Sequence, residues 1–150
     1  MQRIDVAFLQ VRTSHAQLNP MLAVINSIEA HAVVPSTCYH VVADQDEKPL
    51  QATLLRLTRL GRGRVRAHSL ITAPSFVKHL HSELCQLALG PGCVYLWKPL
   101  LHLVLPRWVV RAIVLDADVH FFADISTLWR QFDHFHAAHL IGLAEEQKPA

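Results

Sequence analysis

Two aspartates, Asp116 and Asp118, directly follow the strongest strand signal in the sequence, the largely apolar run 109–115. Residues two apart in an extended chain project to the same side, so both carboxylates can point at one position while Ala117 faces away. Neighbouring carboxylates repel each other, and a hard divalent cation such as Mn²⁺ or Mg²⁺ would remove that repulsion and could also hold phosphate oxygens. The spacing is therefore compatible with a metal site and also with a solvated turn at the end of a strand, and the flanking residues decide between these two interpretations.

A strand that carries this pair needs partners, and the sequence predicts them. Apolar and β-branched runs predict strands over 4–11, 38–43, 65–71, 109–115 and 139–144. Apolar residues at helical spacing predict helices over 18–32 and 50–60, mostly helical structure over 74–105 with a break at 90–92, and a short helix over 125–135. This alternation favours an α/β fold with a parallel sheet covered on both faces, in which ligands bind at the carboxyl ends of the strands.

The composition is that of one soluble globular domain. The chain has 150 residues, of which 51% are hydrophobic and 17% charged. A domain of this size hides roughly 70% of its unfolded surface, so disorder is excluded and no disulfide is required. A formal net charge of +2 predicts no general attraction to nucleic acid or anionic membranes. The cysteines Cys38, Cys85 and Cys93 lack metal-binding spacing, and their odd number leaves at least one thiol unpaired within the chain.

No targeting segment or membrane span is expected. The first fifteen residues interrupt their apolar positions with Asp5, Gln10 and Arg12, unlike a secretory signal. The most apolar stretch, 94–105, contains Lys98 and His102 and falls far short of the roughly 20 apolar residues that a spanning helix needs.

The residues around the aspartate pair carry a family resemblance. The segment RAIVLDADVHFFADISTLWRQFDHF, followed by LIGLAEEQ, resembles the metal-binding segment of glycosyltransferase family 8. It is most similar to the xyloside xylosyltransferases and next to the xylosyltransferase domain of LARGE-type enzymes. Both subgroups have an apolar strand, D-x-D, an aromatic residue, then D/N-I-x-x-L and F-x-x-F. The resemblance extends from Lys98 to Gln147 and is consistent in layout over residues 3–60.

This resemblance implies a GT-A fold, which is Rossmann-like, and the retaining transfer of a sugar from a UDP-sugar donor with Mn²⁺ or Mg²⁺ as cofactor. By position, Asp116 and Asp118 would be the metal ligands, and Ala117 would place its backbone near the donor. No catalytic residue is assigned, because retention needs no protein nucleophile if the acceptor attacks from the side of the leaving group.

Other donor-binding positions also follow from the resemblance. Leu9, Gln10 and Val11 match the end of the first strand, where the family cradles the uracil and ribose. Asp44 matches the acidic residue that contacts the nucleoside. Lys98 matches a lysine that LARGE-type members and glycogenins place near the donor.

One part of the family pattern has no match. Family members take a third metal ligand, a histidine, from a motif near the C-terminal end of the catalytic domain, together with much of the acceptor site. The sequence reaches Ala150 before such a motif. Residues 1–150 are therefore expected to be the N-terminal part of a GT-A domain, ending after the D-x-D strand and the strand that follows it, without the C-terminal part.

The resemblance implies UDP-xylose as the favoured donor and a xylose-bearing glycan as acceptor, such as the O-glucose glycans on EGF-like repeats, in the lumen of the endoplasmic reticulum or Golgi. The alternative is a non-catalytic truncated GT-A fragment that acts as a UDP-binding or interaction module. A haloacid-dehalogenase-type phosphotransferase also carries D-x-D after a strand. That motif belongs on the first strand, whereas here it begins at residue 116.

Three further residue groups have simpler interpretations. The spacing of His120, His134, His136 and His139 does not suit a zinc site, because positions two apart on a helix point to different faces. The basic stretch Arg56, Arg59, Arg62, Arg64 and Arg66 suits a solvated helix end better than a nucleic-acid patch. We expect Trp97, Trp108 and Trp129 to lie in the core or at its rim.

Overall fold

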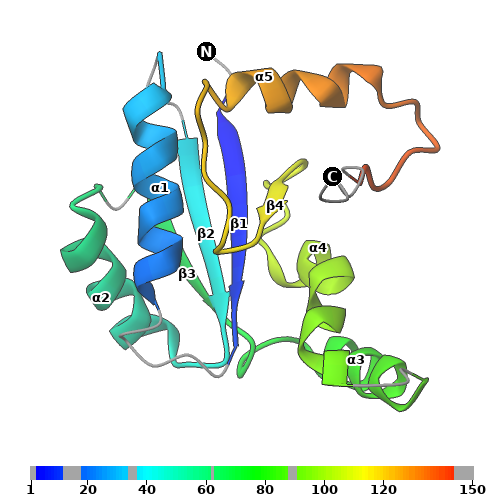
Figure 1. Ribbon diagram of the computed structural model, residues 1–150. Helices are drawn as coiled ribbons and strands as arrows, with labels where there is room; N and C mark the ends of the chain where they lie inside the picture. Colours follow the sequence, from blue (N-terminus) through cyan, green and yellow to red (C-terminus); the bar gives the residue numbers. More distant parts are fainter. Residues whose placement is uncertain (1–2, 12–17, 34–36, 62, 88–90, 144–150) are drawn as a thin grey trace.

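The computed structural model describes residues 3–11, 18–33, 37–61, 63–87 and 91–143. Strands and helices alternate over the first part of the chain, and helical segments dominate its middle (Figure 1). The elements are β1 (Ile4–Gln10), α1 (Asn19–His31), β2 (Thr37–Ala43), α2 (Glu47–Thr58), β3 (Val65–Ser69), α3 (Ser75–Leu87), η2 (Pro91–Leu100), α4 (Leu101–Val104), β4 (Ile113–Leu115), α5 (Ser126–Trp129) and η3 (Arg130–His134). The segments η2 and η3 are 3₁₀ helices.

The four strands form one parallel sheet in the order β3-β2-β1-β4. Successive crossovers carry the chain from β1 to β2 and on to β3, after which β4 pairs with the opposite side of β1. The strand order therefore reverses between β1 and β4. In open α/β sheets, ligands bind outside the carboxyl ends of the strands at such a switch point.

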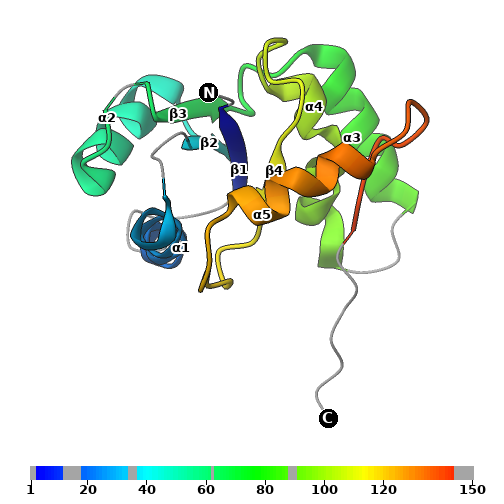
Figure 2. The ribbon, with the colours of Figure 1, turned by 90° about the horizontal axis from the view of Figure 1, so that it is seen from above.

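Helices cover both faces of the sheet, with α1 and α2 on one side and α3 and α4 on the other (Figures 1 and 2). Successive residues of a strand point to opposite faces. Val6 and Phe8 accordingly lie in the core under α1 and α2, while Ala7 lies in the core under α3, η2 and α4. Burial on both faces explains why apolar residues predominate in β1 and at the end of β2.

The structure confirms the predicted α/β architecture and the parallel sheet, with two differences in the strands. Only Ile113–Leu115 of the predicted strand 109–115 pairs with β1, opposite Val6–Phe8. The preceding Val110 is 85% exposed. Apolar, β-branched residues form a strand only where a neighbouring strand supplies hydrogen bonds, and the β1 register reaches just three residues of this run.

The predicted strand at 139–144 is wrong over its described part, residues 139–143. The apolar residues there stay in solvent, with Leu140 and Leu143 each 90% exposed. Gly142 instead lies against the ring of Phe135, so close that a Cβ would sit 2.7 Å from the ring. The apolar composition alone does not make this segment a strand, because no described strand pairs with it. Residues 144–150, including Gln147, lie outside the described residues.

The segment after the Asp116–Asp118 turn runs back along α1 to reach α5 (Figure 1). Ser27 of α1 accepts a hydrogen bond from the Phe121 N–H at 3.1 Å. The Asp124 carboxylate accepts from the Val33 N–H just beyond α1, at 2.9 Å, and from the Ser126 N–H at the start of α5, at 2.7 Å. These bonds fix the exit path of the chain from β4.

A polar cluster lies inside the sheet face that α3 and α4 cover. The fully buried His40 donates from Nε2 to the Asp5 carboxylate at 3.0 Å, and its Nδ1 lies 2.9 Å from Nε2 of His68. Arg3 completes the pairing of Asp5, with Nε 2.9 Å from the same carboxylate oxygen. Trp108 covers the cluster, and the Arg3 guanidinium lies 4.3 Å from its ring centroid.

Candidate functional site

The carboxyl ends of β1 and β4 lie side by side because the two strands are parallel neighbours. Their pairing ends at Phe8 and Leu115. The next residues, Leu9 on one strand and Asp116 on the other, therefore leave the sheet at the same edge. The parallel register thus brings together two segments that are more than a hundred residues apart in the sequence.

A pocket of about 560 Å³ opens at this edge. It contains seven of the eight residues that sequence reasoning assigned to the donor and metal site, and three that it did not. Its lining consists of Leu9, Gln10, Val11, Pro20, Val94, Tyr95, Lys98, Asp116, Ala117 and Asp118. These residues come from β1 and the residue after it, α1, η2 and the turn after β4.

Asp44 is the assigned residue that does not line this pocket. It directly follows β2, the other neighbour of β1, and its side chain is exposed. It therefore lies at the same edge of the sheet, one strand away from the pocket.

Lys98 and Asp116 form an ion pair across the pocket, with Nζ 2.5 Å from Oδ1. The Lys98 side chain is 30% exposed and the Asp116 side chain 56% exposed, so solvent screens the pair. The Lys98 ammonium also lies 5.3 Å from the centroid of the Tyr95 ring. Positions three apart on a 3₁₀ helix face the same way, which explains why Tyr95 and Lys98 meet. The pocket therefore combines an ammonium, an aromatic ring and two carboxylates.

The donor set fits a hard divalent cation. Asp116 and Asp118 present carboxylate oxygens in one pocket, and oxygen ligands of this kind suit Mn²⁺ and Mg²⁺. No third histidine, cysteine or carboxylate joins them at metal-ligand spacing within the part of the chain that the structure describes. The two aspartates could hold a metal from one side and leave its other positions to ligand oxygens and water.

Tyr95, Val94 and Pro20 are pocket residues that sequence reasoning missed. Tyr95 could have been found, since it precedes Lys98 by three residues in a helical stretch. Pro20 could not have been found, because it lines the pocket only as a result of how the first turn of α1 packs in the fold. The sequence did not indicate which cysteines pair, and the structure shows a Cys85–Cys93 disulfide. The unpaired thiol that the sequence predicted is the buried Cys38.

The tryptophans lie in the core or at its rim, as expected. His136 and His139 contact each other, with ring centroids 4.4 Å apart, and join no metal-ligand group among the described residues. Trp97 and Trp129 are buried, whereas Trp108 is 43% exposed and lies over the polar cluster.

The basic stretch is partly structural. Arg64 donates to Glu29 at 2.7 Å, and the Arg66 guanidinium lies 5.0 Å from the Trp108 ring centroid. Arg56 and Arg59 are exposed at the end of α2 and just beyond it, and Arg62 lies outside the described residues. Two of the five arginines, Arg64 and Arg66, therefore make contacts with other side chains of the fold.

The chain is similar to known glycosyltransferases. No family model matches the chain. Two human proteins match most of it: xylosyl- and glucuronyltransferase LARGE2, 34% identical over 111 residues or 72% of this chain, and LARGE1, 31% identical over 112 residues or 73%. The chain is homologous to the LARGE enzymes of glycosyltransferase family 8. It spans 14% of the length of each of these human LARGE proteins.

A solved structure matches the fold over a longer stretch. The apo form of mouse xyloside xylosyltransferase 1 superimposes with a TM-score of 0.57 and 17% sequence identity, over 91% of this chain and 50% of the mouse chain. This likeness shows that the chain has the α/β fold of the GT-A type. It covers only part of that fold. Within the described residues, no helix has the length and apolar character to cross a membrane.

Proposed function

We propose that this chain is the donor-binding part of a retaining glycosyltransferase that uses a divalent metal and a UDP-sugar. The observation that carries the proposal is the single pocket at the β1–β4 switch point, in which the D-x-D carboxylates, Lys98 and the end of β1 meet. The homology to LARGE enzymes supports the same reaction class.

Different residues of the pocket would contact different parts of a nucleoside diphosphate. Leu9, Gln10 and Val11 offer apolar surface and backbone groups to the uracil and ribose. Asp44, one strand away, would extend this nucleoside site along the edge of the sheet. Its exposed position fits contact with a ribose that lies over the strand ends.

The diphosphate would lie between Lys98 and the turn after β4. Asp116 and Asp118 would hold Mn²⁺, or Mg²⁺, which as a Lewis acid stabilises the charge that develops on the departing diphosphate. Lys98 would place a positive charge beside the same phosphates, and the Ala117 backbone would lie next to the sugar. Holding the donor in one orientation supplies much of the rate enhancement in such transfers.

For the finer specificity we propose UDP-xylose as donor and a xylose-bearing glycan as acceptor, with glycans on EGF-like repeats as the first acceptor to test. Xyloside xylosyltransferase and the xylosyl- and glucuronyltransferases are the relatives that motivate this choice. The corresponding place of action would be the lumen of the endoplasmic reticulum or Golgi.

Isothermal titration calorimetry tests the proposal. UDP should bind the chain in the presence of Mn²⁺ and lose most of its affinity when Mn²⁺ is withdrawn. Asp118→Ala should abolish the Mn²⁺-dependent part, and Asp133→Ala, which changes an exposed aspartate outside the pocket, should leave it unchanged. Undiminished binding by Asp118→Ala would contradict the metal assignment. Absence of UDP binding by the unchanged chain would favour an interaction module instead.

Titration with UDP-xylose, UDP-glucose and UDP-galactose in the same experiment addresses the donor. Tighter binding of UDP-xylose than of the two hexose donors would support the proposed choice. Equal or reversed affinities would contradict it without affecting the metal assignment.

A further inference from the structure

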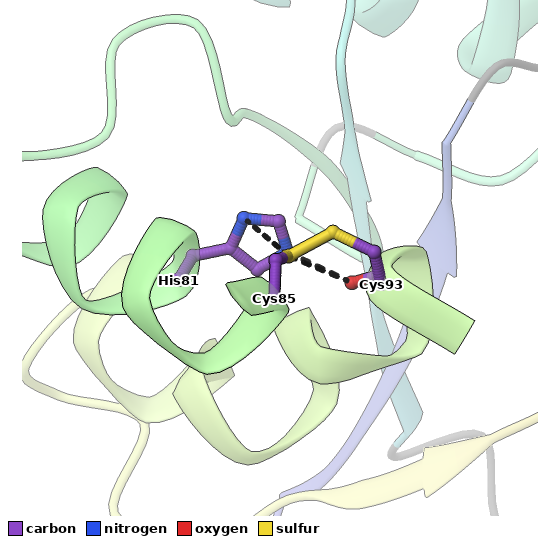
Figure 3. Close-up of a disulfide and its surroundings, with 3 residues drawn as sticks. All are labelled: His81, Cys85 and Cys93. Carbon is purple, nitrogen blue, oxygen red and sulfur yellow. Dashed lines mark hydrogen bonds between the residues drawn. A yellow bond between two sulfur atoms is a disulfide. The ribbon is translucent and has the colours of Figure 1, made fainter. Parts of the chain in front are cut away.

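A disulfide joins the two helical segments that precede β4. Cys85 of α3 and Cys93 of η2 are bonded, with their Cα atoms 5.0 Å apart and a sequence separation of 8. Figure 3 shows this bond between the segments, with the His81 ring beside it. Such a link restricts the position of η2 relative to α3.

His81 reinforces the same junction in two ways. Its Nε2 lies 2.9 Å from the backbone oxygen of Cys93, and because a carbonyl only accepts, Nε2 is the donor. Its ring also stacks on Trp97, with centroids 4.0 Å apart and planes inclined by 15°. The 3₁₀ helix is thus attached to α3 at Cys93 and again at Trp97.

The attached segment is the one that forms a wall of the donor pocket. Val94, Tyr95 and Lys98 line that pocket, and they are interleaved with Cys93 and Trp97 along η2. One side of the segment is therefore fixed to α3 while the other presents Lys98 to Asp116. The ion pair between Lys98 and Asp116 depends on the position of η2, because Lys98 belongs to this segment and Asp116 follows a strand on the other side of the pocket.

We infer that the Cys85–Cys93 disulfide and His81 form a clamp that positions Lys98 and Tyr95 in the pocket, so that donor binding depends on the oxidation state of these cysteines. The inference rests on the proposed function for its link to UDP, and its positioning step is measurable without UDP. Cys85, Cys93 and His81 are positioning residues, because none of them lines the pocket.

The controlling reaction is thiol–disulfide exchange with a dithiol reductant. The sulfur–sulfur bond breaks, each cysteine sulfur gains one electron and one proton, and the dithiol loses two of each to become a cyclic disulfide. Cys85 and Cys93 are both partly exposed, which gives a reductant access to the bond.

Hydrogen–deuterium exchange of the whole chain tests the clamp. Reduction of the wild-type protein should raise exchange in residues 91–100 at least about threefold and leave β1 and β2 unchanged, since local opening involves only the released segment. Reoxidation should restore slow exchange. Cys85→Ser/Cys93→Ser should exchange quickly in 91–100 with or without the reductant, which controls for other effects of the dithiol.

Unchanged exchange in 91–100 after reduction would overturn the clamp. A rise that includes β1 and β2 equally would also overturn it, because the bond would then stabilise the whole fold. His81→Ala should loosen 91–100, and His81→Gln, which retains a side-chain donor toward Cys93, should recover most of the protection.

Calorimetry with UDP and Mn²⁺ on the same samples separates the two proposals. The expected result is a roughly fivefold weaker affinity after reduction, the effect of releasing one partly screened charged contact. Equal affinity in both states, with 91–100 loosened, would overturn the dependence of donor binding on the clamp. If the oxidised protein binds no UDP at all, the proposed function fails, and the exchange data alone decide whether the clamp positions Lys98.

Discussion

Lys98 has two roles in the account, and they predict opposite effects on two ligands. In the structure its ammonium neutralises Asp116, which is also the first proposed metal ligand. In the proposed function, the same ammonium would lie beside the phosphates of the donor. A cation beside a metal ligand repels the metal, whereas it attracts a diphosphate.

Lys98→Met should therefore strengthen the binding of Mn²⁺ alone and weaken the binding of UDP. Each effect should be about two- to fivefold, since exposed ion pairs contribute about 0.2–1 kcal/mol. Mn²⁺ titration with and without UDP measures both. Lys48→Met, on the exposed surface of α2, is the matched control and should change neither affinity. Parallel weakening of both ligands by Lys98→Met would contradict the proposed competition.

His40 and His68 make the buried polar cluster sensitive to pH. Burial on its own would lower the pKa of His40, but hydrogen bonds to Asp5 and Cys38 and the charge of Asp5 raise it overall. Burial, followed by repulsion from His40 and Arg66, lowers the pKa of His68 from 6.5 to about 4. When His40 is protonated it can donate both to Asp5 and to neutral His68, and the distances between these side chains fit that arrangement.

The depressed pKa of His68 predicts a loss of stability in acid. Between pH 6.5 and pH 4 the unfolded chain binds a proton at this position that the folded chain does not. The free energy of unfolding should thus fall by about 1–2 kcal/mol from pH 6.5 to pH 5 because of His68. The raised pKa of His40 contributes stability that is fully present below pH 6.5 and is lost only at higher pH.

His68→Gln retains an acceptor for His40 and removes the titration. Urea unfolding of the variant and the wild type at pH 6.5 and pH 5 gives the difference. The variant should lose about 1–2 kcal/mol less than the wild type over this interval. Equal losses would show that His68 does not titrate as the cluster requires.

At the scale of elements, Asp124 and Ile125 give a physical reason for the D-I-x-x-L pattern after the aspartate pair. The Asp124 carboxylate accepts backbone hydrogen bonds from Val33 and Ser126, which together hold its pKa below the usual range. Ile125 is 1% exposed and fills the core under α1. The pattern therefore fixes the start of α5 against the end of α1, and with it the return path from Asp118.

Asp124→Ala should lower the free energy of unfolding by about 1–2 kcal/mol, the cost of removing a side chain that satisfies helix-terminal N–H groups. Asp124→Asn keeps one acceptor oxygen and should lose about half as much. Urea unfolding at pH 7 measures both variants. A loss in Asp124→Ala no greater than in Asp133→Ala, an exposed carboxylate of η3, would contradict this role.

The elements also show which features a sequence can predict. The segments that form β1 and β2 are buried on both faces, so their apolar residues were sufficient to predict them as strands. The run 139–143 has similar character but lacks a described partner strand, and the pattern could not reveal this. Asp116 and Asp118 were predictable because the end of a strand places them. Pro20 was not predictable, because its place in the pocket follows only from the packing of α1 in the folded chain.

For the whole molecule, the central feature is the reversal of strand order between β1 and β4. It places a pocket between two parallel strand ends, and both the nucleoside segment and the D-x-D turn line that pocket. The chain covers half of the mouse structure that shares its fold and 14% of the human LARGE proteins. The proposed function therefore depends on the claim that this portion forms a donor site.

Electron paramagnetic resonance of Mn²⁺ tests that claim most directly, because the signal of hydrated Mn²⁺ disappears when the ion is held by protein. Mn²⁺ with UDP should lose most of this signal when the wild-type chain is added. With Asp116→Asn/Asp118→Asn the signal should stay at the level of Mn²⁺ and UDP without protein. Equal loss of signal with the wild type and the variant, or no loss with either, would contradict a donor and metal site at Asp116 and Asp118.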